Sequence, residues 1–546
     1  MDIEALLVTK FDATTKVWSG PKSRPMYHPD ISVGQIVHMN LFSNPKNVLQ
    51  INDTEGIQLT NEAVLLLSTR VAINLMQKGV TQKDVVGIIA GNTSYVMPVC
   101  YGTLFLGAPF HPLDVSFNKE AIAHSWKKTT PKVVFCDGHA YERVKEVKEE
   151  NGLNYIIFTL NHHIEGVPKV DDLFVSHPME KIFRPLEVPS GEETAVILCS
   201  SGTTGLSKSV CLSHRSCNAT FGIILDTCDD VVLNFSSLYW LSGCFSMLAC
   251  GITGATYLVI SKPFTPEQAL YLIDKYRVTK TMFPPRNIAL VLESPDIQHK
   301  SIKSIKTLNC GGAKLPVEIR NRIKKYMSPT ATIFFGYGTT EVGGIAFTLS
   351  EKFPESTGIL IPNVEVKIVD ENGNNLGIGE DGEICVANGH KWPGYFGDKA
   401  ATDEVYEAET WYHTGDLGHF DENGYLYIVD RIKEIMKSKG YHISPSEIED
   451  VVLQLPDVAD VCVCGIPDIL SVNKPAAFVI KSVGSNITEQ TIITHVSAKM
   501  PHYKHLTGGV YFVDELPRTP SGKILRRVVA KEAEKLYNLQ NGRNEL

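Results

Sequence analysis

Between about residues 85 and 340, the chain alternates short apolar runs with longer stretches of helical periodicity. Examples are VVGIIAG before SYVMPVCYGTLFLGA, KVVFCDG before ERVKEVKEENG, and ATYLVIS before TPEQALYLIDKYRV. The last helix has a start signal, because Thr265 can cap it, Pro266 takes its first position and Gln268 stands three residues after the cap. Strands that alternate with helices predict an α/β protein whose parallel sheets are covered on both faces.

The pattern changes after about residue 350. Apolar and polar residues alternate in VEVKIVDENGNNLG, GEICVAN and LGHFDENGYLYIVD, with Asn-Gly pairs between the runs. This combination predicts antiparallel hairpins, and so a small β subdomain over about 350–430. The charged stretch DRIKEIMKSKG leads from there into a mixed α/β segment, so we expect one domain over 1–430 and a second over 431–546.

Composition excludes several classes of protein. The chain has 546 residues, 43% of them apolar, which is enough for roughly three or four domain-sized cores. Its net charge is -9 and it has no long run of Lys or Arg, so we expect no nucleic-acid partner. The longest apolar stretch, CFSMLACGITGATYLVI at 244–260, is short for a membrane span and predicts a buried helix, turn and strand.

The N-terminus and the cysteines bear on the compartment. MDIEALLVTKFDATTK has no apolar core, so we expect no signal peptide and a cytoplasmic location. The twelve cysteines include no C-x-x-C pair, which argues against structural zinc and fits a reducing compartment.

The stretch SSGTTGLSKSV, at 200–210, is the first candidate for chemistry. It follows the apolar run TAVILC and matches the G-x-x-x-x-G-K-[ST] pattern except that Ser207 replaces the second glycine. A P-loop NTPase also needs an apolar strand ending in a magnesium-binding Asp, and we assign none. Hydroxyls, glycines and one lysine can wrap a polyphosphate, so the stretch by itself fits both a phosphate loop and an ordinary turn.

Five further motifs change this picture. They are NCGGAKLP (309–316), FFGYGTTEVGG (334–344), YHTGDLG (412–418), DRIKEIMKSKGYHISPSEIE (430–449) and LPRTPSGKILRR (516–527). With the loop, their order and spacing resemble the adenylate-forming (AMP-binding) superfamily of acyl-CoA synthetases, 4-coumarate–CoA ligases and beetle luciferases, over about 50–535. The loop is then that family's phosphate loop, and its likeness to a P-loop is superficial.

The resemblance implies a fold and a reaction. The fold is a large N-terminal domain of two αβ subdomains and a β-barrel-like subdomain, followed by a small mobile α+β domain with its hinge near 430–433. In the reaction, a carboxylate attacks the α-phosphorus of Mg-ATP, giving acyl-AMP and pyrophosphate. The thiol of coenzyme A then displaces AMP. This chemistry needs positive charge, Mg²⁺ and backbone donors more than a side-chain nucleophile.

The resemblance also assigns residues to the nucleotide. The expected phosphate contacts are Ser201, Gly202, Thr203, Thr204, Gly205 and Lys208. The expected adenine contacts are Gly311, Gly312, Ala313, Tyr337, which would stack on the base, and Gly338. Thr340 and Glu341 resemble the ATP–magnesium site, where Glu341 offers the hard oxygen that Mg²⁺ prefers. Asp416 resembles the acceptor of the ribose hydroxyls, and Arg431 a second ribose or phosphate contact.

The C-terminal motifs imply the catalytic and moving parts. Lys523 resembles the lysine that reaches the α-phosphate during adenylation, and Lys433 matches the hinge. Lys437 and Gly440 resemble the face that serves the thiol step after domain rotation. Arg526 and Arg527 are expected to be surface residues at a basic helix start.

The sequence departs from the family pattern in places. Ser207 replaces a proline and Ser209 a glycine, and Trp240 stands where many relatives carry a histidine. Trp240, Gly344 and Ile345 are expected in the acyl pocket, whose mostly apolar lining favours a medium- or long-chain fatty acid. A phenylpropanoid–CoA ligase, a luciferase-like adenylate oxidase and a catalytically silent nucleotide-binding protein stay open as alternatives.

Location and partners follow from the same resemblance. The chain ends in NGRNEL and not in the Ser-Lys-Leu-type peroxisomal address of several relatives, so the cytoplasm remains the expectation. A fatty substrate is compatible with peripheral association with a membrane. The oligomeric state is left open.

Overall fold

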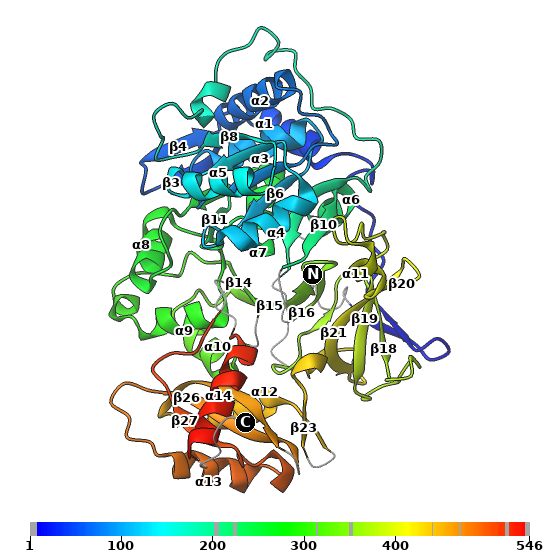
Figure 1. Ribbon diagram of the computed structural model, residues 1–546, viewed down its shortest axis with the longest axis vertical. Coiled ribbons are helices and arrows are strands. Elements are labelled where there is room, and N and C mark those ends of the chain that lie inside the picture. Colours follow the sequence, from blue (N-terminus) through cyan, green and yellow to red (C-terminus); the bar gives the residue numbers. More distant parts are fainter. Residues whose placement is uncertain are drawn as a thin grey trace. The chain divides into compact units, whose positions relative to one another are not determined.

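The computed structural model describes residues 8–200, 207–221, 227–312, 315–348, 353–438, 441–468, 471–518 and 524–540 (Figure 1). The chain forms two compact units. The first unit comprises residues 1–10, 19–365 and 386–412, and the second unit comprises residues 11–18, 366–385 and 413–546. The expected domain boundary at 430 and the hinge near 430–433 stay predictions.

The first unit contains a six-stranded sheet in the order β10-β9-β6-β5-β7-β8. Its strands are β5 (Val86–Ile89), β6 (Phe110–Leu113), β7 (Val133–Cys136), β8 (Ile156–Thr159), β9 (Thr194–Cys199) and β10 (Ser209–Ser213). All neighbours are parallel except β9 and β10, which are antiparallel. Strands β5 (VGII) and β7 (VVFC), inside the sheet, are buried throughout, as expected of parallel strands that are covered on both faces.

A nine-stranded sheet follows the order β17-β16-β15-β14-β13-β11-β12-β3-β4. Its strands are β3 (Val48–Asn52), β4 (Ile57–Thr60), β11 (Val231–Asn234), β12 (Thr256–Val259), β13 (Lys280–Met282), β14 (Thr307–Gly311), β15 (Thr332–Thr339), β16 (Gly343–Thr348) and β17 (Ile359–Leu360). The interior pairs are parallel, whereas β4, β16 and β17 make the edges antiparallel.

The helices of the first unit cover these sheets. They are α1 (Val33–Ser43), α2 (Asn61–Gln77), α3 (Val96–Phe105), α4 (Lys119–Thr129), α5 (Tyr141–Glu150), α6 (His214–Phe221), α7 (Leu241–Thr253), α8 (Pro266–Tyr276), α9 (Pro285–Glu293), α10 (Val317–Lys324) and α11 (Lys399–Asp403). The predicted start of α8 is confirmed, because the Thr265 side chain accepts a hydrogen bond from the Gln268 N–H. None of the described helices combines the length and apolar character needed to cross a bilayer.

The apolar stretch 244–260 forms the predicted helix, turn and strand. Helix α7 ends at Gly254, whose φ of +81° is a left-handed conformation that glycine adopts at little cost. Strand β12 then starts at Thr256 and is buried over most of its length. The run is therefore apolar because it forms two adjacent buried elements, a helix and a strand.

The second unit contains strands of two sheets. In one, β2 (Val17–Ser19), β18 (Glu365–Val369), β19 (Gly382–Ala387) and β21 (Trp411–Phe420) are neighbours in that order, β1 (Lys10–Asp12) pairs with β2, and β22 (Leu426–Arg431) pairs with β21. The β21–β22 hairpin contains the predicted Asn-Gly pair. Its turn is longer than two residues, because the Asp421 N–H donates to the Tyr425 carbonyl and Gly424 takes a φ of +80°.

The other sheet has the order β24-β23-β26-β25, with β27 parallel to β26. Its strands are β23 (Met436–Ser438), β24 (Tyr441–Ile443), β25 (Val458–Asp468), β26 (Val472–Lys481) and β27 (Gly509–Phe512). The helices α12 (Pro445–Val452), α13 (Glu489–Lys499) and α14 (Arg526–Gln540) complete this part of the chain. The mixed α/β character expected after residue 431 is confirmed.

Candidate active site

The candidate phosphate loop connects two antiparallel strands. The Ser200 N–H donates to the Lys208 carbonyl at 2.8 Å, and the Lys208 N–H donates to Ser200 Oγ at 3.2 Å. Cys199 at the end of β9 pairs with Ser209 at the start of β10. A P-loop runs from a strand into a helix, whereas this loop runs into a strand. The likeness to a P-loop is therefore superficial, as the sequence analysis predicted.

Ser209, which replaces a glycine of the family pattern, lies in a paired strand. Ser209 is 3% exposed and extended, and the Phe396 N–H donates to its carbonyl at 2.8 Å. A residue in a paired strand does not need the conformational freedom of glycine. The predicted contacts Ser201, Gly202, Thr203, Thr204 and Gly205 lie outside the described residues.

Tyr395 joins two of the predicted site residues. The Lys208 Nζ lies over its ring, 4.6 Å from the centroid, and its hydroxyl donates to Glu341 Oε1 at 3.0 Å. Glu341 is 8% exposed and Tyr395 is 7% exposed. Burial and the charge of Glu341 raise the pKa of Tyr395, so the phenol stays protonated and keeps its donor role. Lys208 thus contacts the ring of this tyrosine, and Glu341 contacts its hydroxyl group.

Further aromatic residues enclose this group. The Trp392 ring packs edge-on against Tyr395, with centroids 5.0 Å apart, and against Tyr412, with centroids 5.5 Å apart. The Trp392 indole N–H donates to the Cys211 carbonyl on β10 at 3.1 Å. Burial and the nearby Glu341 carboxylate raise the pKa of Tyr412 well above its usual value. Glu341 therefore lies beside an aromatic cluster of Trp392, Tyr395 and Tyr412, whose hydroxyl groups are neutral.

The sequence did not predict this aromatic cluster. Trp392, Tyr395 and Tyr412 are separated from Glu341 by about fifty residues or more, and only the tertiary fold brings them to it. The signal that was available is the concentration of aromatic residues at 392–412, in a segment otherwise rich in charge and glycine.

The predicted adenine segment lies at the carboxyl ends of two parallel strands. Gly311, the last residue of β14, pairs with Gly336 of β15, directly before Tyr337. A side chain at Gly338 would place its Cβ 2.3 Å from the Gly343 carbonyl oxygen, so only glycine fits there. Ligands of α/β sheets bind at this edge. Gly312, at a φ of +84°, follows β14, and Ala313 lies outside the described residues.

Thr340 and Glu341 occupy the connection between β15 and β16. Gly338 and Gly344 face each other across this hairpin. Gly344 is exposed, whereas Ile345 is fully buried. Of the three predicted pocket residues, Gly344 and Ile345 belong to β16, and only Gly344 of these two is accessible.

Trp240 immediately precedes α7. Its ring is half-buried and packs edge-on against Tyr239, with centroids 4.7 Å apart. A cavity lies beside α7, and its mainly apolar lining includes Val96, Met97, Leu238, Met247 and Tyr257.

In the second unit, Asp416 and Arg431 are direct partners. They face each other in the β21–β22 register, and Arg431 Nε lies 2.8 Å from Asp416 Oδ1. The Asp416 side chain is 5% exposed and the Arg431 side chain is 38% exposed. The structure thus brings together the two residues predicted to contact the ribose.

The segment after Arg431 starts with a short exposed helix. Lys433 is an exposed residue of the 3₁₀ helix Ile432–Glu434. Before it, Asp430 accepts hydrogen bonds from Ser444 Oγ at 2.6 Å and from the Ser446 N–H at 3.2 Å. Asp430, which sequence reasoning missed, therefore ties the end of β22 to the start of α12.

The remaining predictions have different outcomes. Lys437 lies in β23 opposite His442, while Gly440 and Lys523 lie outside the described residues. The prediction that Arg526 is a surface residue is wrong. Its side chain is 16% exposed, pairs with Glu434 and Glu449, and donates to the Val463 carbonyl at 2.6 Å. Two acidic partners on other elements stabilise this buried charge, and the sequence does not show them.

Comparison with known proteins identifies the class. The family model of the AMP-binding enzyme matches residues 42–396, and that of the AMP-binding enzyme C-terminal domain matches residues 447–523. The chain therefore belongs to the AMP-binding enzyme family. The resemblance found in the sequence motifs is confirmed.

Individual relatives cover nearly the whole chain. A probable 4-coumarate–CoA ligase 1 of Dictyostelium discoideum is 29% identical over 526 residues, which are 91% of this chain and 95% of the relative. The 4-coumarate:CoA ligase 1 of Petunia hybrida is 31% identical, over 87% of this chain and 89% of the relative.

Solved structures confirm the predicted fold. The ATP-bound MatB of Rhodopseudomonas palustris has a TM-score of 0.83 at 22% identity, over 93% of this chain and 100% of that chain. The anthranilate CoA ligase AuaEII in complex with anthranoyl-AMP has a TM-score of 0.84 at 21% identity, over 94% of this chain and 98% of that chain.

Proposed function

We propose that this protein is an AMP-forming acid–CoA ligase. The observation that carries the proposal is the group of Lys208, Tyr395 and buried Glu341, where Glu341 closely follows the carboxyl end of β15. It combines a cation, a fixed hydroxyl and a carboxylate where an α/β sheet binds its ligand. Relatives that are named CoA ligases, and that match this chain over most of their length, support the same activity.

In the proposed first step, a substrate carboxylate oxygen bonds to the α-phosphorus of ATP, and the bond to the pyrophosphate oxygen breaks. Lys208 and the hydroxyls and glycines of residues 201–205 contact the β- and γ-phosphates. Lys523 stabilises the charge that develops on the α-phosphate. Glu341, with Thr340, is suited to hold Mg²⁺, which neutralises phosphate charge when bound.

Other residues hold the nucleoside in this proposal. Tyr337 stacks on the adenine, along the segment 311–313, and Gly338 keeps the backbone close. Asp416 accepts hydrogen bonds from the ribose hydroxyls, and Arg431 both orients Asp416 and contacts the nucleotide.

In the second step, the thiol sulfur of coenzyme A bonds to the acyl carbon, and AMP leaves with the electron pair of the acyl–oxygen bond. Lys437 and Gly440 serve this step, and Lys433 is the hinge about which the C-terminal segment turns between the two steps. The domains 1–430 and 431–546 are the units that move in this proposal.

For the acid, we propose a medium- or long-chain fatty acid. The segment Val342–Ile345, which the sequence assigns to the acyl pocket, carries no charged residue, and this supports an aliphatic substrate. A phenylpropanoid acid such as 4-coumarate is the second candidate, because the relatives compared above carry that name.

The test measures pyrophosphate release with Mg-ATP and a panel of acids, from about C6 to C18 fatty acids to 4-coumarate, with and without coenzyme A. We expect release and acyl-CoA formation with one acid class, and loss of release in Lys523→Ala. Release with 4-coumarate alone would replace the fatty acid by the second candidate. ATP binding without release on any acid would contradict the ligase and favour a silent nucleotide-binding protein.

A further inference from the structure

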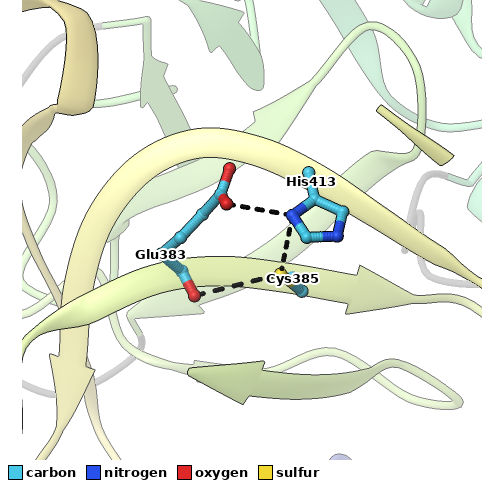
Figure 2. A group of neighbouring side chains, drawn as sticks. All are labelled: Glu383, Cys385 and His413. Carbon is cyan, nitrogen blue, oxygen red and sulfur yellow. Dashed lines mark hydrogen bonds and ion pairs between the residues drawn. The ribbon is translucent and has the colours of Figure 1, made fainter. Parts of the chain in front are cut away.

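Three potential metal ligands of the second unit converge on one point (Figure 2). Glu383 and Cys385 are two residues apart on β19, so their side chains point to the same face of the sheet. His413 lies on the neighbouring strand β21. Its Nδ1 lies 2.9 Å from Glu383 Oε2 and 3.4 Å from Cys385 Sγ, and the three donor atoms lie within 4.8 Å of one another.

These separations are close to those of a tetrahedral zinc site. Zinc binds sulfur at about 2.3 Å and imidazole nitrogen or carboxylate oxygen at about 2.0–2.2 Å, which places neighbouring ligand atoms roughly 3.3–3.8 Å apart. The 3.4 Å between sulfur and nitrogen already fits. The 2.9 Å between Glu383 Oε2 and His413 Nδ1 is shorter than this range, so the carboxylate would move away from the imidazole when an ion binds.

The surroundings of the cluster favour a metal with one open position. Cys385 is fully buried, whereas the side chains of Glu383 and His413 are 24% and 30% exposed. An ion can therefore enter from the Glu383–His413 side and keep a water molecule there. A thiolate, an imidazole and a carboxylate form a mixed set that suits Zn²⁺ and not Mg²⁺ or Ca²⁺.

The second carboxylate oxygen of Glu383 is already engaged. Its Oε1 accepts a hydrogen bond from the Gly415 N–H at 3.0 Å. The Oε2 atom can therefore bind an ion while Oε1 keeps the carboxylate oriented, as hydrogen-bonded ligands do in metal sites. Gly415 adjoins Asp416, so the cluster is tied to the part of β21 that carries the proposed ribose acceptor.

We propose that Glu383, Cys385 and His413 form a binding site for a divalent transition-metal ion of the Zn²⁺ type. The site uses Oε2, Sγ and Nδ1 as its three protein ligands. It is separate from the proposed magnesium ligands Thr340 and Glu341 and does not depend on the ligase activity.

The test uses the full chain and Co²⁺ as a spectroscopic probe. We expect one equivalent of Co²⁺ to give the thiolate-to-metal charge-transfer absorption, and Zn²⁺ to remove it by displacement. Cys385→Ser should abolish the band. His413→Gln, a change at the more exposed side of the cluster, should weaken binding by at least about 10- to 100-fold.

Two matched controls distinguish this site from adventitious binding. His419 pairs with Asp381 in the same way, Nδ1 to Oδ1 at 2.7 Å, so His419→Gln should leave the band unchanged. Cys228, an exposed cysteine of the first unit, is the control thiol, and Cys228→Ser should also leave it unchanged. No charge-transfer band, a band that survives both Cys385→Ser and His413→Gln, or a band lost in Cys228→Ser would overturn the proposal.

Discussion

The two units hold the carboxylates assigned to the nucleotide in different ways. In the first unit, Glu341 accepts a hydrogen bond from the neutral Tyr395 phenol. In the second, Asp416 pairs with the Arg431 guanidinium. A carboxylate whose donor is neutral leaves its negative charge available to a cation. A carboxylate beside a guanidinium has its charge balanced by that partner and is better suited to accept hydrogen bonds from neutral hydroxyls. The difference matches the roles proposed here, Mg²⁺ for Glu341 and ribose for Asp416.

Glu341→Gln should have the largest effect, because it removes the charge and keeps the shape. We expect pyrophosphate release to fall by a factor on the order of 10²–10³, with a changed dependence on Mg²⁺ concentration. Glu422→Gln, at an exposed turn, is the control. An unchanged Mg²⁺ dependence would remove Glu341 from the proposed metal site.

Asp416→Asn should raise the KM for ATP by about 10- to 100-fold, because hydrogen bonds to a charged group contribute about 1.5–3 kcal/mol. Thermal stability should change little, since Arg431 is 38% exposed and stays hydrated. Asp381→Asn, in a similar but more exposed pair, is the control for steady-state kinetics. Equal KM shifts in both variants would contradict a specific role for Asp416.

Tyr395→Phe should reduce pyrophosphate release by about tenfold and the free energy of unfolding by about 1–3 kcal/mol, because buried Glu341 loses its donor. The phenyl ring remains available to Lys208. Tyr406→Phe removes a hydroxyl beside the same Trp392 ring, and it tests whether any lost hydroxyl has this effect. Denaturant unfolding and Mg²⁺ titrations of both variants separate stability from activity.

A fourth prediction concerns pH. Burial lowers the pKa of His214 to about 4, and its Nδ1 accepts a hydrogen bond from the Val33 N–H at 3.1 Å. Because the unfolded state binds the proton more tightly, this neutral histidine stabilises the fold fully above about pH 6.5, and stability is lost as pH falls toward 4. His214→Asn keeps an acceptor but does not titrate, so its unfolding free energy should vary less between pH 6.5 and 4.

The outcome of that measurement also bears on the comparison between the units. In the second unit, by contrast, His419 pairs with the Asp381 carboxylate. If the unfolding free energy of His214→Asn falls between pH 6.5 and 4 as much as that of the wild type, His214 does not contribute to the acid sensitivity of the first unit.

The fold was predictable where local signals and burial agree. The cap at Thr265 acts within a few residues and has the predicted effect, and the helix, turn and strand predicted over 244–260 are present. The position of the phosphate loop after an apolar strand was predictable for the same reason. These elements need no distant partner to be recognised.

The parts that were missed depend on distant partners. Tyr395 contacts Glu341 across 54 residues of sequence, and Arg526 meets Glu449 across 77. A buried arginine and an exposed arginine look alike in a charged stretch, because only the acidic partners distinguish them. The predicted roles of Lys437, Gly440 and Lys523 remain to be tested by substitution.

The strand that follows the candidate phosphate loop has a consequence for how this loop would attract a nucleotide. A loop that leads into a helix adds the positive end of the helix macrodipole to the field at the phosphates. Here β10 follows the loop, and sheets have only small net dipoles. In the proposed function, Lys208 then supplies much of the attraction, and we expect the association rate of ATP to fall steeply with rising ionic strength.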